Sequence, residues 1–180
     1  MSPQDLLQFW FHPERQAHWF KSTPELDREI GARFGALWQR GRDGELAHWE
    51  ATPEDALALV ILLDQFPLNM FRGRPEGFAT EASSRAVAAR AIERGFDQAL
   101  DDQGKAFLYM PFMHSEALAD QERSLALLAA AGLDANLKWA RHHRDIVRRF
   151  GRFPHRNAIL GRLHTPAEKE WLASPEAFHG

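Results

Sequence analysis

The chain has 180 residues and a mass of 20.6 kDa, which suits a single folded domain. It is 44% hydrophobic and 26% charged, so it can bury a core and does not belong to the disordered class. Its net charge is −3, so the chain as a whole does not have the strong positive charge that is typical of nucleic-acid-binding proteins. The absence of cysteine excludes disulfide scaffolds, thiolate metal sites and thiol nucleophiles.

Two features of the sequence bear on location. The longest uninterrupted apolar run, residues 56–63, is too short to span a bilayer. The first residues, Met-Ser-Pro-Gln-Asp, lack the basic and apolar blocks of a signal peptide. We therefore expect a cytoplasmic protein with no membrane contact.

Helix starts are marked by a recurring dipeptide, Ser-Pro or Thr-Pro. The hydroxyl can accept a hydrogen bond from a free amide of the first turn, and proline fits the first helical position because it lacks an N–H. The pairs are at 2–3, 23–24, 52–53, 165–166 and 174–175. Acidic residues follow each pair, and Thr165 with Glu168 fits a capping box.

Glycines are expected to close several of these helices, at Gly41, Gly95, Gly132 and Gly151. The predicted helices are 3–11, 24–40, 53–66, 80–94, 104–118, 120–131 and 135–150, with shorter pieces near 44–50, 155–160 and 166–178. No segment alternates as a strand would. The sequence thus predicts one all-α domain, residues 1–180, built as an irregular antiparallel helical array of tetratricopeptide-like or solenoid-like form.

Polar residues in apolar surroundings are the candidates for function, because their burial is costly unless they are paired. Asp64 extends the apolar stripe of the helix 53–66 and should point inward. It is interpreted either as a ligand-orienting or catalytic carboxylate or as half of a structural ion pair. His114 and His143 also lie on apolar stripes. They are interpreted either as acid–base groups or metal ligands, or as core histidines bonded to backbone carbonyls.

The segment 141–164 has the most unusual composition of the chain. It contains seven arginines and four histidines but one acid, Asp145. Part of it, the loop 150–157, combines glycine, proline and two aromatics with Arg152, His155, Arg156 and Asn157. Guanidinium groups in such a loop are suited to gripping a carboxylate or phosphate. A second polar loop, 69–78, follows the apolar helix. It is interpreted either as part of a ligand site or simply as a solvated turn.

Five motifs together resemble one known family. They are Leu-Leu-Asp-Gln-Phe-Pro (62–67), Phe-Arg-Gly (71–73), Pro-Phe-Met-His-Ser-Glu (111–116), Asp-Gln-Glu-Arg (120–123) and Arg-Phe-Gly-Arg-Phe-Pro-His-Arg-Asn (149–157). The chain is similar over nearly its whole length to the DUF924 family, mostly bacterial proteins of unassigned function. The resemblance implies a tetratricopeptide-like helical fold and no particular reaction. The chain departs from the family pattern at Leu68, where an arginine is common, and at Leu163 and His164.

These observations predict an internal cleft that binds a small anionic molecule or an acidic peptide terminus. The candidate catalytic residues are Asp64, His114, Glu116 and His155, and the candidate ligand-binding residues are Gln65, Asn69, Arg72, His143, Arg149, Arg152, Arg156, Asn157 and Arg162. Two alternatives stay open: an acid–base enzyme of hydrolase or lyase type that uses the same cleft, and a helical scaffold for protein–protein interaction. We expect no metal, no cofactor and no nucleic acid, and a homodimer is compatible with the sequence.

Overall fold

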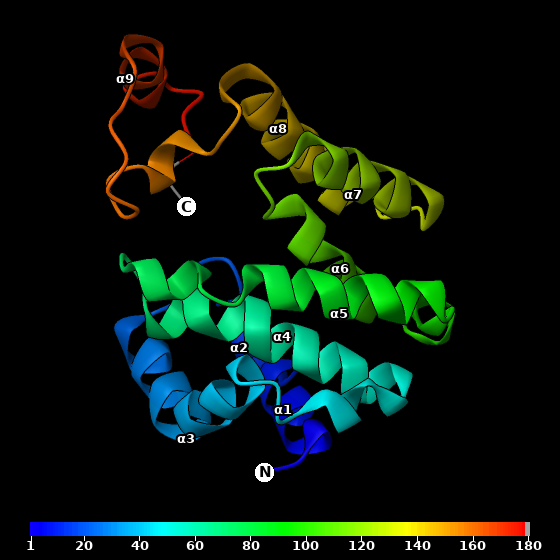
Figure 1. The fold of residues 1–180 in the computed structure, drawn as a ribbon. Helices are drawn as coiled ribbons and strands as arrows, with labels where there is room; N and C mark the ends of the chain where they lie inside the picture. The colour runs from blue at the N-terminus through cyan, green and yellow to red at the C-terminus, as the bar shows by residue number, and fades with distance from the viewer. Residues whose placement is uncertain (179–180) are drawn as a thin grey trace. The chain divides into compact units, whose positions relative to one another are not determined.

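The computed structural model describes residues 1–178, and within them the chain folds into nine α-helices with no β-strand (Figure 1). The α-helices are α1 (Pro3–Trp10), α2 (Pro13–Gln16), α3 (Pro24–Arg42), α4 (Pro53–Met70), α5 (Glu81–Glu93), α6 (Asp102–Met113), α7 (Leu118–Ala130), α8 (Asp134–Phe150) and α9 (Pro166–Leu172). Four 3₁₀-helices are interspersed: η1 (Ala47–Ala51), η2 (Pro75–Phe78), η3 (Phe96–Ala99) and η4 (Pro154–Arg156). The predicted all-α class is confirmed.

The chain divides into two compact units. The N-terminal unit comprises residues 1–72 and 76–111, and the C-terminal unit comprises residues 73–75 and 112–180. The boundary in the later part of the chain falls inside α6, directly after Pro111. The single domain expected from the sequence stays a prediction.

Most of the predicted helix starts are confirmed. A side-chain oxygen accepts a hydrogen bond from the backbone N–H three residues on at Ser2, Thr23, Thr52 and Thr165. The capping box of Thr165 and Glu168 is also present. The predicted start at Ser174 is wrong: the Ser174 hydroxyl donates to the Trp171 carbonyl, and so it bonds the end of α9 instead of capping a new helix.

The predicted helix ends are confirmed at Gly95, Gly132 and Gly151, which have φ values of 72°, 69° and 70°. The prediction at Gly41 is wrong, because α3 continues through it to Arg42. A β-carbon at Gly41 would lie 3.1 Å from a methyl of Leu63, so this glycine serves close helix packing and not a turn.

The helix predicted over 104–118 is interrupted in its second half. It ends at Met113, and a short turn leads into α7. In that turn the Ser115 hydroxyl accepts from the Ala117 N–H (3.1 Å) and donates to Asp120 (2.6 Å). The side chain of Ser115 therefore replaces helical backbone bonds, as serines do at helix boundaries.

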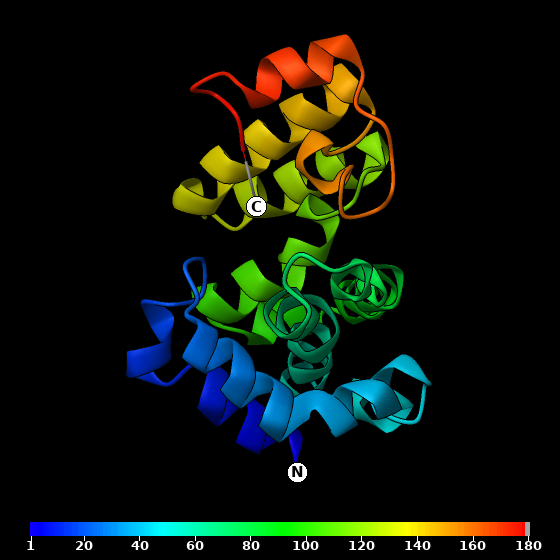
Figure 2. The same cartoon turned by 90° about the vertical axis from the view of Figure 1, so that its left-hand side faces the viewer.

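Helix α4 is the centre of the N-terminal unit. Every residue from 56 to 67 is buried, as the all-round apolar sequence predicts. In Figures 1 and 2 it passes between α3 and α5, and α1 also packs on it. Its Phe66 ring lies 4.8 Å from that of Phe34 and 5.5 Å from that of Trp10, centroid to centroid.

Pro67 lies inside α4, where it lacks the N–H that the Leu63 carbonyl would normally receive. The Thr80 hydroxyl, at the start of α5, donates to that carbonyl instead at 2.6 Å. Thr80 Oγ1 in turn accepts from the Trp38 indole at 3.1 Å. This buried chain of bonds ties α3, α4 and α5 together and allows α4 to continue to Met70.

In the C-terminal unit, α7 and α8 pack side by side and are joined through the turn at Gly132 (Figure 1). The core of this unit contains Ile146, Val147, Phe153 and Trp171. The loop 151–165 and α9 are thus fixed to α8 by Phe153 and Trp171. Within residues 1–178, no helix combines the length and the apolar character that a bilayer crossing requires.

Candidate functional site

The predicted site residues are divided between the two units. The N-terminal unit holds Asp64, Gln65, Asn69 and Arg72, all of α4 or the turn after it. The C-terminal unit holds His114, Glu116, His143, Arg149, Arg152, His155, Arg156, Asn157 and Arg162.

The group in the N-terminal unit is closely hydrogen-bonded. Gln65 Nε2 donates to Asp64 Oδ2 at 2.6 Å, and both side chains are buried. The Arg72 guanidinium grips Asp27 of α3 with Nε and Nη2, at 2.9 and 3.2 Å. The hydrogen bonds that Arg72 donates to Asp27 raise the pKa of Arg72. Arg72 therefore joins the end of α4 to α3, which is a structural role.

Glu116 is held by two residues of the arginine-rich segment 141–164. Its two oxygens accept from Arg162 at 2.6 and 2.8 Å, and Oε1 also accepts from the Phe153 N–H at 2.8 Å. Burial alone would raise the pKa of Glu116, but the bonds from Arg162 and Phe153 outweigh it and lower the pKa. Glu116 is thus an ionised anchor, and it is poorly suited to act as a general acid at neutral pH.

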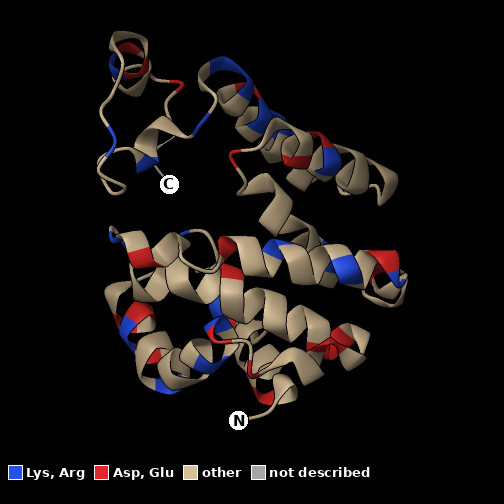
Figure 3. Cartoon of the chain, in the orientation of Figure 1, with Lys and Arg blue, Asp and Glu red and all other residues tan. Residues whose placement is uncertain are grey.

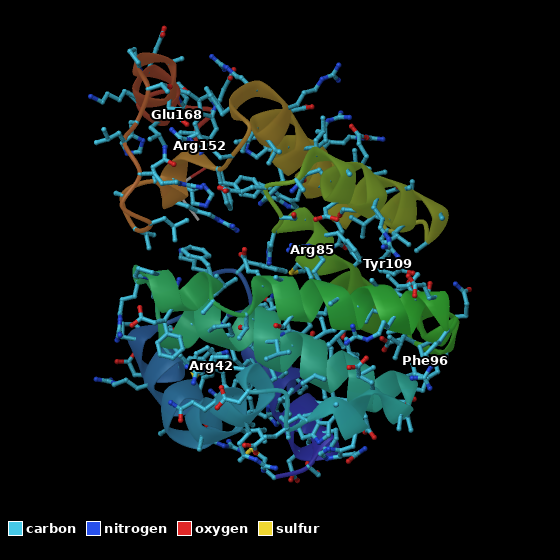
Figure 4. All side chains as sticks on the ribbon, in the orientation of Figure 1. Arg42, Arg85, Phe96, Tyr109, Arg152 and Glu168 are labelled. Atoms are coloured by element: carbon cyan, nitrogen blue, oxygen red, sulfur yellow. The ribbon has the colours of Figure 1, made fainter. Side chains whose placement is uncertain are left out.

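Arg152 and Glu168, both labelled in Figure 4, form a second ion pair. Arg152 donates through Nε and Nη2 to the two carboxylate oxygens, at 2.6 and 2.9 Å. These bonds lower the pKa of Glu168 to about 2, against an opposing effect of burial, and the Thr165 N–H adds to the lowering. The pair clamps the loop after α8 to the first turn of α9.

Replacing Glu168 with glutamine is expected to lower the free energy of unfolding at pH 7 by about 1–2 kcal/mol, because charge-assisted bonds become neutral ones. The folded pKa is depressed, so the stabilisation is present above the ordinary pKa and is lost as the pH falls toward 2. Urea unfolding at pH 7 and pH 3 measures this difference.

Glu122→Gln is the matched control for that substitution. Its carboxylate also pairs with an arginine, Arg144, but is 51% exposed. An exposed pair contributes less than about 1 kcal/mol. Equal losses in Glu122→Gln and Glu168→Gln would contradict a structural clamp at Glu168.

Three polar residues of the C-terminal unit lie around the ring of Phe153, which is fully buried. The His143 and His155 rings lie 5.5 and 5.6 Å from the Phe153 ring, and the Arg156 guanidinium carbon lies 4.7 Å from its centroid. Phe178 contacts both histidine rings, at 4.7 and 5.1 Å. We call Phe153, His143, His155, Arg156, Asn157 and Arg162 the Phe153 cluster.

His143 is held in the neutral form. Its pKa is lowered to about 4, chiefly by burial and also by the nearby charges of His114, His142 and Arg156, while the hydrogen bond to the Trp139 carbonyl opposes the lowering. Its Nδ1 lies 2.9 Å from the Trp139 carbonyl, which can only accept, so Nδ1 carries the proton. Nε2 is therefore the ring nitrogen with the lone pair.

In the Phe153 cluster, Asn157 Oδ1 and Arg162 Nε are buried without a hydrogen-bond partner among the described residues. Asn157 is fully buried, and its Nδ2 lies 3.2 Å from His164 Nδ1. Arg162 donates through both Nη atoms to Glu116 and through Nη2 to the Phe153 carbonyl, whereas its Nε–H has no acceptor among the described residues. One acceptor and one donor of the same loop are thus left unsatisfied, which is unusual for buried polar atoms.

Arg149 lies apart from this cluster. Its guanidinium carbon is 4.8 Å from the Phe150 ring centroid, and it lines a surface hollow of about 330 Å³ with Trp171 and Glu170. Within residues 1–178, no three histidine, aspartate or glutamate side chains are grouped in a way that would hold a metal ion.

The family model for bacterial proteins of unknown function, DUF924, matches residues 6–176. The chain belongs to the DUF924 family. A solved structure of a protein of unknown function from Agrobacterium tumefaciens is 41% identical to this DUF924 chain. It superposes with a TM-score of 0.89, and the match covers 95% of this chain and 96% of the other. No functionally curated protein matches the chain.

Sequence reasoning missed three residues of this DUF924 chain that hold the candidate site residues in place. In the sequence, Phe153 stands out only as one of the two aromatic residues of the loop 150–157. Glu168 stands out only as part of a capping box, and Asp27 only as an acidic residue that follows the pair at 23–24. The partners of Glu168 and Asp27 lie 16 and 45 positions away. A local pattern gives no signal for such pairs.

Proposed function

We propose that this DUF924 protein binds a small oxyanion, either a free carboxylate or phosphate or the carboxylate of an acidic peptide terminus, at the Phe153 cluster. The observation that carries the proposal is the pair of buried, unsatisfied atoms, Asn157 Oδ1 and Arg162 Nε. An oxyanion oxygen would accept from Arg162 Nε, and a hydroxyl or N–H of the same ligand would donate to Asn157 Oδ1.

The state of His143 supports binding over acid–base catalysis. A general base works best when its pKa lies near the operating pH, and the pKa of His143 is about 4. At neutral pH the ring is an uncharged acceptor of fixed orientation, which suits recognition of a ligand hydroxyl. Glu116 is equally unsuited to proton transfer, because Arg162 and the Phe153 N–H occupy its oxygens.

The charge of the C-terminal unit also supports an anionic ligand. Residues 73–75 and 112–180 contain eleven lysines and arginines against eight aspartates and glutamates, while the whole chain is negative. In Figure 3 the lysine and arginine positions along α8 are coloured blue. Such a local excess of positive charge favours anions through long-range attraction.

Inorganic phosphate, acetate and an acidic tetrapeptide are the first probes. Each would be added to the full chain in a thermal-shift measurement, against sodium chloride of the same ionic strength. A specific ligand raises the melting temperature by mass action, with a stabilisation of about 2.7 kcal/mol at one hundred times Kd. We expect a saturable rise with at least one of the three.

Asn157→Leu tests where the ligand binds, because it removes the unsatisfied acceptor at similar volume. It is expected to abolish the ligand-dependent rise. The control is Arg141→Gln, which removes an exposed arginine of α8. No rise with any probe, or the same rise in Asn157→Leu as in the unchanged chain, would overturn the proposal and favour the scaffold interpretation.

A tetratricopeptide-like arrangement and a cytoplasmic location belong to the same proposal. The short turn between α7 and α8 is typical of helical-hairpin arrays. The proposal needs no membrane and no second protein, and it is compatible with a homodimer.

A further inference from the structure

A hollow of about 420 Å³ opens on the N-terminal unit, far in sequence from the Phe153 cluster. It is formed where α1, α2 and α3 meet, and its walls include Asp5 and Phe9 of α1, Glu14 and Arg15 of α2, and Arg33 of α3. The volume falls within the range of about 300–1,000 Å³ that is typical of small-molecule sites. None of these residues was a candidate from the sequence.

Two guanidinium groups form one side of the hollow. The Arg33 and Arg15 guanidinium carbons lie 4.6 and 5.1 Å from the Phe9 ring centroid. Both arginines share a single carboxylate, Glu29, at 3.1 and 2.9 Å. Among these three side chains the balance is one positive charge in excess.

Most of the donors of these two arginines are unused within residues 1–178. Arg15 donates through Nη2 and Arg33 through Nη1, and both bonds go to Glu29. The cation–π contacts with Phe9 help to hold each guanidinium group in place. A carboxylate that entered the hollow would thus meet preorganised donors, which guanidinium groups present in bidentate geometry.

Negatively charged side chains line the same hollow. Asp5 and Glu14 line it, and Asp5 forms no ion pair among the described residues. The Asp5 carboxylate is held by Ser2, whose N–H donates to Oδ2 at 2.7 Å, so its position is fixed by the cap of α1. The pKa of Asp5 is lowered first by the hydrogen bonds with Ser2 and then by the charges of the N-terminal ammonium group and Arg33, so the carboxylate is ionised at neutral pH.

We propose that this hollow binds a small zwitterion of the amino-acid type. The carboxylate would bind Arg15 and Arg33, the ammonium group would bind Asp5 and Glu14, and an aliphatic side chain would pack on the edge of Phe9. The site lies wholly within the N-terminal unit and is independent of the oxyanion site proposed above.

Three matched probes test the assignment by isothermal titration calorimetry on the full chain. L-leucine carries both charged groups, isocaproate lacks the ammonium group, and isoamylamine lacks the carboxylate. We expect leucine to bind at least about tenfold more tightly than either analogue, because each missing group leaves one side of the hollow unpaired. No saturable heat with leucine, or equal affinity for leucine and isocaproate, would overturn the proposal.

Two variants locate the binding. Arg33→Gln is expected to lower the affinity for leucine at least about tenfold. Asp5→Asn is expected to lower the affinity for leucine to the value measured for isocaproate. Asparagine keeps an oxygen that accepts from the Ser2 N–H, so the helix cap survives. The control is Arg28→Gln, whose guanidinium is exposed and pairs with Glu25 on the surface of α3. Leucine binding that is unchanged in both Arg33→Gln and Asp5→Asn would also overturn the assignment.

Discussion

Replacing Thr80 with valine is expected to lower the free energy of unfolding by about 3 kcal/mol, although the side-chain volume hardly changes. Two buried groups lose their hydrogen-bond partner at once. One is the Leu63 carbonyl, to which Pro67 cannot donate because it has no N–H, and the other is the Trp38 indole N–H. Thr80 caps no helix through its side chain, so the loss measures these two bonds alone. Urea unfolding of the two proteins at pH 7 gives the difference.

Ser84→Ala is the control for Thr80→Val. The Ser84 hydroxyl, one helical turn further along α5, donates to the Val60 carbonyl at 3.2 Å. That carbonyl also has the ordinary helical donor, the N–H of Asp64, so the loss should stay near 1 kcal/mol or below. Thr80→Ser restores the hydroxyl and should recover most of the stability. If Thr80→Val lowers the free energy of unfolding no more than Ser84→Ala does, the Leu63 carbonyl does not depend on the Thr80 hydroxyl for a hydrogen bond.

The helix pattern was predictable because its signals are local. Capping hydroxyls, prolines at the first position and glycines with positive φ act within a few residues of the helix end, so Thr23, Thr52 and Gly151 could be interpreted from the sequence. The end of α4 was not predictable in this way. Pro67 suggested an end at residue 66, but the helix continues to Met70 because Thr80 supplies the missing donor.

The chemistry of the candidate site was predicted only in part. The segment 141–164 contains one acid, so Arg152 and Arg162 were interpreted as groups for a ligand anion. In the structure their carboxylates are Glu168 and Glu116, which lie outside that segment. Arginine-rich loops attract internal carboxylates as readily as external ones, and only the tertiary fold decides between them.

The inward orientation of His143 was predicted by its helical spacing, and its burial confirms it. Its titration was not predictable, because the depressed pKa depends on how completely Phe153 and Phe178 cover the ring. The sequence left open a core histidine bonded to a carbonyl, and the bond to the Trp139 carbonyl is of that kind.

His143 should therefore make the protein sensitive to mild acid. Its pKa is about 4 when folded and 6.5 ordinarily. Between these values the unfolded chain binds a proton that the folded chain does not, so the free energy of unfolding falls as the pH drops through this window. At about 1.4 kcal/mol per unit of pKa, the full loss approaches 3 kcal/mol by pH 4. Above pH 6.5 the residue contributes no pH dependence.

His143→Asn isolates this contribution, because asparagine keeps an N–H for the Trp139 carbonyl but has no proton to gain. The loss of stability between pH 7 and pH 4.5 is expected to be about 2 kcal/mol smaller in His143→Asn than in the unchanged chain. Carboxylates also titrate below pH 5, but they are common to both proteins and cancel in the comparison. His48→Asn, on the exposed part of η1, controls for the substitution itself. If His143→Asn and His48→Asn lose stability in acid by the same amount, His143 is not held neutral by its burial, and its proposed role as an uncharged acceptor for a ligand fails with it.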